Sequence, residues 1–170
     1  GIVPTGAATS DRQVFSGDTM NQELVARAAE MIYESRRIVV FTGAGISTES
    51  GIPDFRSPGG IWSQYNSDDL TYQKFWSHEK FRKLYWEYDI ARYPAMRDAD
   101  PNYAHKAMVE LEEIGKLLAL VTQNIDGLHR DAGNSVEKIY ELHGTVREVT
   151  CLDCQTRWPR EEITDMMERE

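Results

Sequence analysis

A short apolar run that leads into a glycine-rich segment is the feature that most constrains the fold of this chain. Residues 38–41 (IVVF) are branched or aromatic, and their number suits a buried strand. Residues 42–56 then read TGAGISTESGIPDFR. Glycines behind a strand leave backbone N–H groups bare, so a phosphate can approach them closely. The pattern therefore predicts a strand followed by a phosphate-binding loop.

Composition excludes several classes of protein. The 170 residues suit one domain, or one domain with a small appendage, and 41% hydrophobic with 28% charged residues is typical of soluble globular proteins. A net charge of −9 argues against nucleic-acid binding, and no apolar run is long enough to predict a membrane span. Two cysteines are too few for a disulfide framework, which favours a reducing, cytoplasmic location.

The spacing of apolar residues predicts three helices before the C-terminal region. The first covers residues 20–35 and follows a capping box of Thr19 and Gln22. The second covers 78–93, between an N-cap at Ser77 and a loop over 94–101. The third covers 104–114 and ends at Gly115. A short acidic helix is expected within 159–170. The histidine at position 105 lies on the third helix, and we expect it to be a surface or packing residue without a functional role.

Two further strands are predicted over 117–121 and 139–142. Strands that alternate with helices indicate a doubly wound parallel sheet, in which ligands bind beyond the carboxyl ends of the strands. Each of the three strands here runs into a polar or glycine-rich cluster: the Gly43 loop, residues 123–126 (QNID) and His143. Their convergence on one crevice is the strongest functional indication in the sequence.

Each cluster taken alone has an alternative reading. The dinucleotide fingerprint needs a third glycine where Thr48 stands, so a hydride-transferring dehydrogenase is disfavoured. Asn124 and Asp126 could recognise an amide or a sugar, or could cap a turn. His143 could act as a base near neutral pH, or could be a hydrogen-bonded core histidine.

Cys151 and Cys154 form a CxxC pair, which is half of a tetrahedral zinc site. The sixteen residues that follow contain no further Cys or His, so four ligands cannot be completed within this sequence. A thioredoxin-like redox pair is the alternative, but that motif belongs near the start of a βαβ unit.

The motifs, taken together and in order, resemble one family. They are GAGIS at 43–47, GIPDFRS at 51–57, TQNIDGLH at 122–129, HG at 143–144 and the CxxC pair. This order is similar to that of the sirtuins, the Sir2-like NAD-dependent protein deacylases, and the resemblance runs from about residue 20 to residue 158. It implies a Rossmann-like NAD-binding portion over 20–149 and the start of a small zinc-ribbon subdomain over 150–170. Residues 1–19 are rich in Gly, Ser, Thr and Ala without an apolar period, so we expect a flexible extension there, ahead of a natural start at Met20. A native N-terminal arm is the alternative.

The resemblance also implies a role for each motif. The NAD diphosphate would be held by Gly43, Ala44, Gly45 and Ser47, and the mobile cofactor loop would be formed by Pro53, Asp54, Phe55, Arg56 and Trp62. The ribose would be contacted by Gln123 and Asn124, and the nicotinamide carboxamide would be held by Ile125 and Asp126. The general base would be His143, the other catalytic residue would be Asn124, and zinc would be bound by Cys151 and Cys154. In the family's reaction an acyl group passes from lysine to ADP-ribose, and nicotinamide is released.

Two departures from the family pattern bear on function. Relatives that remove acidic acyl groups carry Tyr-x-x-Arg where this chain has Asp89 and Arg92, so we expect Asp89 to repel a succinyl group and acetyl-lysine to be the substrate. The chain also stops before the second CxxC pair and the strands that bind adenine and substrate, so it appears truncated. A non-catalytic NAD-binding or partner-binding module and a mono-ADP-ribosyltransferase are the alternatives to an NAD-dependent protein deacetylase.

Overall fold

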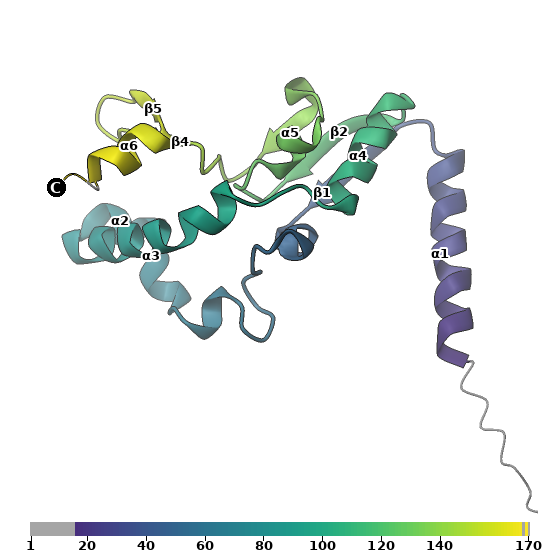
Figure 1. Ribbon diagram of the computed structural model, residues 1–170, viewed down its shortest axis with the longest axis horizontal. Coiled ribbons are helices and arrows are strands. Elements are labelled where there is room, and N and C mark those ends of the chain that lie inside the picture. The colour runs from purple at the N-terminus through teal and green to yellow at the C-terminus, as the bar shows by residue number, and fades with distance from the viewer. Residues whose placement is uncertain (1–15, 168, 170) are drawn as a thin grey trace, which may run out of the picture. The chain divides into compact units, whose positions relative to one another are not determined.

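A computed structural model describes residues 16–167 and 169, and its contacts divide the chain into two units, 1–36 and 37–170. The first unit contains one described helix, α1 (Ser16–Glu34; Figure 1). The helix begins before the predicted capping box, so the prediction of a cap at Thr19 is wrong: that residue already has helical backbone. The expected extension falls mostly on residues 1–15, outside the described part of the chain.

The second unit is built on a parallel sheet of three strands, as the sequence predicts. They are β1 (Ile38–Thr42), β2 (Leu117–Thr122) and β3 (Ile139–Glu141), in the order β1-β2-β3. Thr42 pairs with Thr122, and Thr122 pairs with Glu141. The carboxyl ends of all three strands therefore lie level with one another, and the segments that follow them emerge at the same edge.

Helices α4 (Tyr103–Glu113) and α5 (Leu128–Ala132) connect these strands and pack against each other, and α4 also contacts β2 (Figure 1). The third predicted helix is thus confirmed, and so is its stop, because Gly115 has a φ of +75° that favours glycine. The short helix η4 (Val136–Lys138) precedes β3. Alternating strands and helices define an α/β, Rossmann-like fold.

The second predicted helix differs from expectation at both ends. Ser77 ends the short helix α2 (Tyr72–Ser77), and α3 (Glu79–Arg97) begins behind His78. Pro94 lies inside α3, where a loop was predicted. A proline in the last turn removes only one hydrogen bond of the helix ladder, and the buried Tyr93 and Met96 on either side of it hold this turn against the core.

The long segment between β1 and α2 contains three short 3₁₀ helices: η1 (Ala44–Ser50), η2 (Ile61–Ser63) and η3 (Ser67–Leu70). At the other end of the unit, β4 (Glu148–Thr150) and β5 (Arg157–Pro159) form an antiparallel hairpin. It is followed by α6 (Arg160–Met167), the predicted acidic helix.

One hydrophobic core joins the segments that carry the motifs. Ile52 from the glycine-rich segment, Leu128 from α5 and Val146 behind the HG pair pack with Tyr93 and Met96 of α3. The backbone N–H of Val146 also donates to the carbonyl oxygen of Ile125 at 2.8 Å. This core positions the predicted active-site segments against each other.

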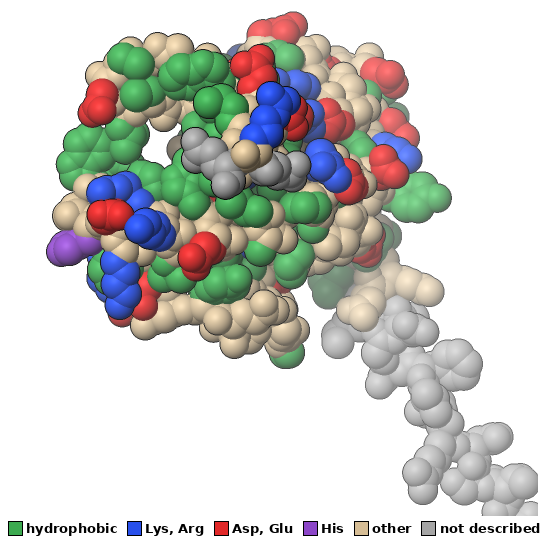
Figure 2. All heavy atoms as spheres, turned by 60° about the vertical axis from the view of Figure 1, so that its left-hand side comes forward, with side chains coloured by type: hydrophobic (Ala, Val, Ile, Leu, Met, Phe, Trp, Pro, Cys, Tyr) green, Lys and Arg blue, Asp and Glu red, His purple; other side chains and the backbone are tan. Residues whose placement is uncertain are grey.

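Charges on the second unit are mixed. Basic and acidic side chains lie interspersed on the face shown in Figure 2, without a continuous basic surface there. Between residues 16 and 167, no helix combines the length and the apolar character that crossing a membrane requires.

Candidate active site

Three buried polar side chains meet where β1 and β2 end, and we call Ser47, Asn124 and Asp126 the strand-end cluster. The Ser47 hydroxyl donates to Asp126 Oδ2 at 2.8 Å and accepts from Asn124 Nδ2 at 3.1 Å. Leu128 N donates to Asp126 Oδ1 at 3.0 Å. The three residues are 1, 9 and 5% exposed, respectively. The predicted convergence of two strand-end segments is thus present, and it is held by hydrogen bonds between residues almost 80 positions apart.

The glycine-rich loop approaches the same point with its backbone. Asn124 Nδ2 donates to the Gly43 carbonyl at 3.2 Å, which fixes the start of η1. The N-cap of η1 makes no side-chain hydrogen bond, and a Cβ placed on Gly45 would meet no atom of the described residues within 4 Å. The loop therefore offers bare backbone and open space, which fits the approach of a phosphate. The Ser47 hydroxyl is occupied by the cluster, so its expected contact with NAD would come from its backbone.

Two histidines pack behind the cluster. His129 Nε2 lies 3.0 Å from Thr42 Oγ1, and its ring meets that of His105 at 4.9 Å between centroids. Both rings are at most 2% exposed, and burial lowers both pKa values, that of His129 to about 4. A surface or packing position was expected for His105, and the structure shows packing. No role was expected for His129, although it closes the TQNIDGLH motif.

His143 lies at the end of β3 with an exposed ring. Its Nδ1 is 3.0 Å from the carbonyl oxygen of Gln123, the residue that follows β2. A carbonyl can only accept, so this hydrogen bond requires the proton on Nδ1 and leaves the lone pair on Nε2. A histidine in this tautomer can accept a proton from a substrate hydroxyl, as predicted for a general base.

The predicted cofactor loop is folded largely by Asp54. Its Oδ1 accepts from the backbone N–H groups of Arg56 and Ser57, and its Oδ2 accepts from the Ser57 hydroxyl. The hydrogen bonds from Ser57 are the main reason why the pKa of Asp54 is lowered. Both carboxylate oxygens thus shape the loop.

An aromatic pair and a glycine also shape this loop. The rings of Phe55 and Trp62 lie 5.2 Å apart, and each residue is 38% exposed. A Cβ on Gly60 would lie 2.7 Å from the Asp54 carbonyl oxygen, so the turn admits only glycine there. The same segment contains Pro53, which follows the buried Ile52, and the exposed Arg56.

Asp89 is not a free carboxylate. It forms an ion pair with Arg160 of α6, and the two side chains are 14% and 4% exposed. The Arg160 guanidinium also lies over the Tyr93 ring, 4.5 Å from its centroid. Arg92 instead donates to the Tyr88 hydroxyl. The expected repulsion of a succinyl group by Asp89 is therefore wrong in its premise, because Arg160 neutralises this charge.

Cys151 and Cys154 lie in the loop of the β4–β5 hairpin, and both are free thiols. A hydrogen bond with the Thr156 hydroxyl, 3.2 Å away, is the main cause of a lowered pKa of Cys154, which favours the thiolate that metals bind. Among residues 16–167, however, no three Cys, His, Asp or Glu side chains gather as metal ligands would. The pair fits half of a tetrahedral zinc site.

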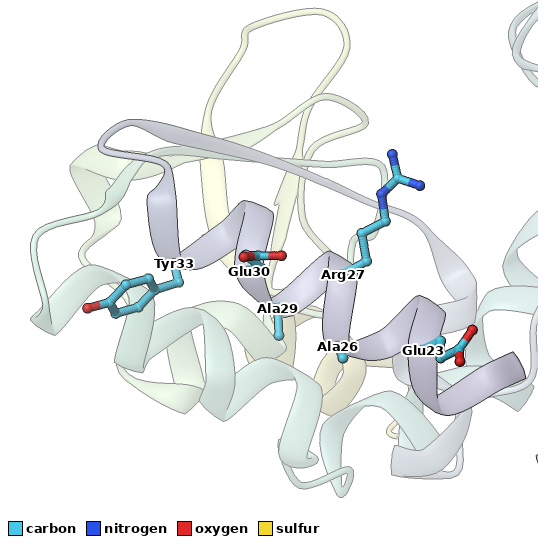
Figure 3. Close-up of a pocket in the computed structure, with 6 residues that line it drawn as sticks. All are labelled: Glu23, Ala26, Arg27, Ala29, Glu30 and Tyr33. Atoms are coloured by element: carbon cyan, nitrogen blue, oxygen red, sulfur yellow. The ribbon is translucent and has the colours of Figure 1, made fainter. Parts of the chain in front are cut away.

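One surface recess lies on α1 and is lined by Glu23, Ala26, Arg27, Ala29, Glu30 and Tyr33 (Figure 3). Arg27 points away from Ala26 and Ala29, and the side chains fan out from a single helix. Such a surface brings no set of reactive groups together.

A parallel sheet with a glycine-rich loop behind its first strand defines an α/β nucleotide-binding class of protein. Within that class, the Sir2 family model matches residues 43–170, and the chain belongs to the Sir2 family. It is 44% identical over 153 residues to an NAD-dependent protein deacetylase of Thermodesulfovibrio yellowstonii, covering 90% of this chain and 58% of that protein. An NAD-dependent protein deacylase of Thermococcus sibiricus is 45% identical over 134 residues, covering 77% and 50%.

Solved structures give the same result. A Sir2 protein with a deacetylated p53 peptide and 3′-O-acetyl ADP-ribose has a TM-score of 0.77 and 38% identity, with 86% of this chain and 57% of that chain covered. A second Sir2 structure has a TM-score of 0.73 and 37% identity, with 87% and 57% covered. The chain thus spans a little over half the length of these relatives.

Proposed function

We propose that this protein is an NAD-dependent protein-lysine deacetylase, to which residues 20–149 contribute the NAD-binding portion. The observation that carries the proposal is the strand-end cluster, with His143 hydrogen-bonded to the residue beside it. Membership of the Sir2 family and relatives named as NAD-dependent deacetylases and deacylases support it.

The residues present fit NAD. The bare backbone of residues 43–45 suits the diphosphate, and the side chains of Gln123 and Asn124, which follow β2, would hold the ribose. Ile125 and Asp126 suit the nicotinamide carboxamide, because a carboxylate accepts from an amide N–H. NAD, when bound, supplies the ADP-ribose that accepts the acyl group and the nicotinamide that leaves.

The protein's own part in the reaction follows from its hydrogen bonds. The His143 Nε2 lone pair would take a proton from a ribose hydroxyl, while the bond from Nδ1 to the Gln123 carbonyl holds the ring in this tautomer. Ser47 and Leu128 orient the Asp126 carboxylate, so it need not reorganise when substrate binds. The burial of the three side chains would help to keep water away from bound nicotinamide.

Replacing the base tests the proposal. In His143→Ala, the rate of lysine deacetylation should fall about 10²- to 10⁴-fold, the usual contribution of a general base. His78→Ala removes another exposed histidine and is the matched control. Retained NAD-dependent deacetylation in His143→Ala would overturn the proposal. Label from NAD that ends on protein would instead indicate ADP-ribosyl transfer.

We also propose that Cys151 and Cys154 are two ligands of a structural zinc ion in a zinc-ribbon subdomain that starts within 150–170. The supporting observations are the hairpin that presents both thiols and the lowered pKa of Cys154. Zinc measured by mass spectrometry should be lost in Cys151→Ser and in Cys154→Ser. Equal zinc content in the wild type and both variants would contradict this assignment.

Acetyl-lysine in a peptide or protein is the substrate we propose, by analogy with the peptide bound to the solved Sir2 relative. A cytoplasmic location is proposed because both thiols are free and a reducing compartment keeps them so. We propose no nucleic-acid or membrane partner, in line with the net charge of −9.

A further inference from the structure

Asn102 uses its side chain in two directions at once. Its Oδ1 accepts from the backbone N–H groups of Ala104 and His105, at 2.9 and 3.4 Å, and so caps the start of α4. Its Nδ2 donates to the Ile46 carbonyl at 2.7 Å and to the Ser50 hydroxyl at 3.0 Å. Both acceptors belong to η1, more than fifty positions earlier. A cap requires only the oxygen, so the two donated bonds call for a separate explanation.

The two hydrogen bonds that Asn102 donates thus hold the C-terminal part of η1. The first end is fixed by Asn124, through the Gly43 carbonyl, and by Thr42, which lies beside His129. His105 connects these two sides: its Nδ1 accepts from Asn102 N at 3.3 Å, and its ring packs on His129. The loop between β1 and Ile52 is therefore held at its entry by the buried Asn124 and at its exit by the partly buried Asn102.

We propose that Asn102 is a positioning residue for the NAD site, which holds η1 in the conformation that receives the diphosphate. The inference rests on the proposed function, because it takes η1 as the segment that faces NAD. A loop with few side chains of its own inside the core needs such an anchor: of its seven residues, only Ser47 is buried. Without the anchor, η1 would populate other conformations, and binding affinity would fall with the fraction that remains competent.

Two substitutions separate the cap from the anchor. Asn102→Ser keeps a good N-cap but cannot reach Ile46. Asn102→Asp keeps the acceptor oxygen of the cap and adds a negative charge that suits a helix N-terminus, but its second oxygen replaces the NH2 donor and places a carboxylate against the Ile46 carbonyl. Asn66→Ser is the matched control, because Asn66 caps η3 through the Asp68 N–H.

The first measurement is amide hydrogen exchange of the unliganded protein in the peptide covering 43–52. The Ile46 and Gly51 N–H groups are bonded within this segment, to the carbonyls of Gly43 and Thr48 at 3.0 Å each, and report on its opening. Exchange there should rise about ten-fold in Asn102→Asp and Asn102→Ser, the size expected for losing one or two hydrogen bonds. It should stay unchanged in Asn66→Ser, and exchange in α4 should change little in Asn102→Asp.

The second measurement is calorimetric titration with ADP-ribose. Its dissociation constant should rise in both Asn102 variants, by the factor by which the competent fraction of η1 falls. Unchanged exchange over 43–52 in folded Asn102→Asp would overturn the proposal, and so would a uniform rise over 43–52, α4 and β2, which marks a purely structural role. If exchange changes as expected but the wild type does not bind ADP-ribose, the anchor stands and the proposed function fails.

Discussion

The strand-end cluster and the β4–β5 hairpin show two different ways of holding polar groups. Ser47, Asn124 and Asp126 are buried, and each of the three side chains takes part in two hydrogen bonds with groups of the protein itself. Cys151 is half-buried and Cys154 is exposed, at the turn of a hairpin whose strands have three residues each. The cluster is preorganised by the described chain, whereas no third Cys, His, Asp or Glu side chain of the described residues gathers with the two thiols as a metal ligand would.

The hairpin region nevertheless depends on one buried charge pair. Arg160, directly behind β5, connects α6 to α3 through Asp89 and donates from Nε to the Thr164 hydroxyl at 3.1 Å. Its backbone N–H also donates to the Arg147 carbonyl at 2.8 Å. The hairpin that carries the thiols is thus connected to α3 through an ion pair whose arginine side chain is only 4% exposed.

The largest expected effect concerns the ion pair between Arg160 and Asp89. Arg160→Met should lower the free energy of unfolding by about 3 kcal/mol, because Asp89 is left buried without its partner. Chemical denaturation measures this. Arg157→Met is the control: its partner Glu148 is exposed, and the change should stay within about 1 kcal/mol. Adding Asp89→Leu to Arg160→Met should recover most of the loss, and equal losses in the two arginine variants would contradict the comparison.

The next effect concerns catalysis at the cluster. In Asp126→Asn, an amide offers one acceptor where the carboxylate offers two, so the Ser47 hydroxyl or the Leu128 N–H loses its partner. NAD turnover should fall about 10²-fold, as when a preorganised electrostatic group is removed. The rate of nicotinamide release measures it, with Asp98→Asn at the surface as control. Activity within a few-fold of wild type would mean that the carboxylate is not part of the site.

The smallest effect is a pH dependence behind the cluster. Burial depresses the pKa of His129 to about 4, so the folded state binds fewer protons than the unfolded state below the usual value of about 6.5. The contribution of His129 to the free energy of unfolding is therefore fully present above about pH 6.5 and is lost as the pH falls. At pH 5 the loss should be about 2 kcal/mol. His105 acts in the same direction, and Glu141, whose pKa burial raises, acts in the opposite one.

Denaturation at pH 7 and pH 5 tests this dependence. The difference in unfolding free energy should be clearly smaller in His129→Gln than in the wild type, because the buried imidazole that resists protonation is gone. Glu112, with a pKa of about 2 in the folded protein, contributes only below about pH 4.5 and does not disturb this window. An identical difference in both proteins would show that His129 does not govern it.

Much of the fold was predictable because it follows from local patterns. The three strands and α4 were expected within one or two residues, since runs such as IVVF and a glycine stop depend on neighbours alone. The sequence did not predict the start of α1 or the extension of α3 through Pro94. The first depends on residues without a periodic apolar signal, and the second on packing of Tyr93 and Met96 against segments distant in sequence.

For the site, the sequence alone determined which residue types follow each strand, and with them the family and the expected role of His143. Only the tertiary structure decided how these residues are connected: that Ser47 serves Asp126, that Asp54 folds its own loop, that Arg160 neutralises Asp89 and that Asn102 reaches η1. The physical reason is that a hydrogen bond or an ion pair between residues fifty to eighty positions apart leaves no periodicity or spacing to read. It exists only once the shared core has brought the two segments together.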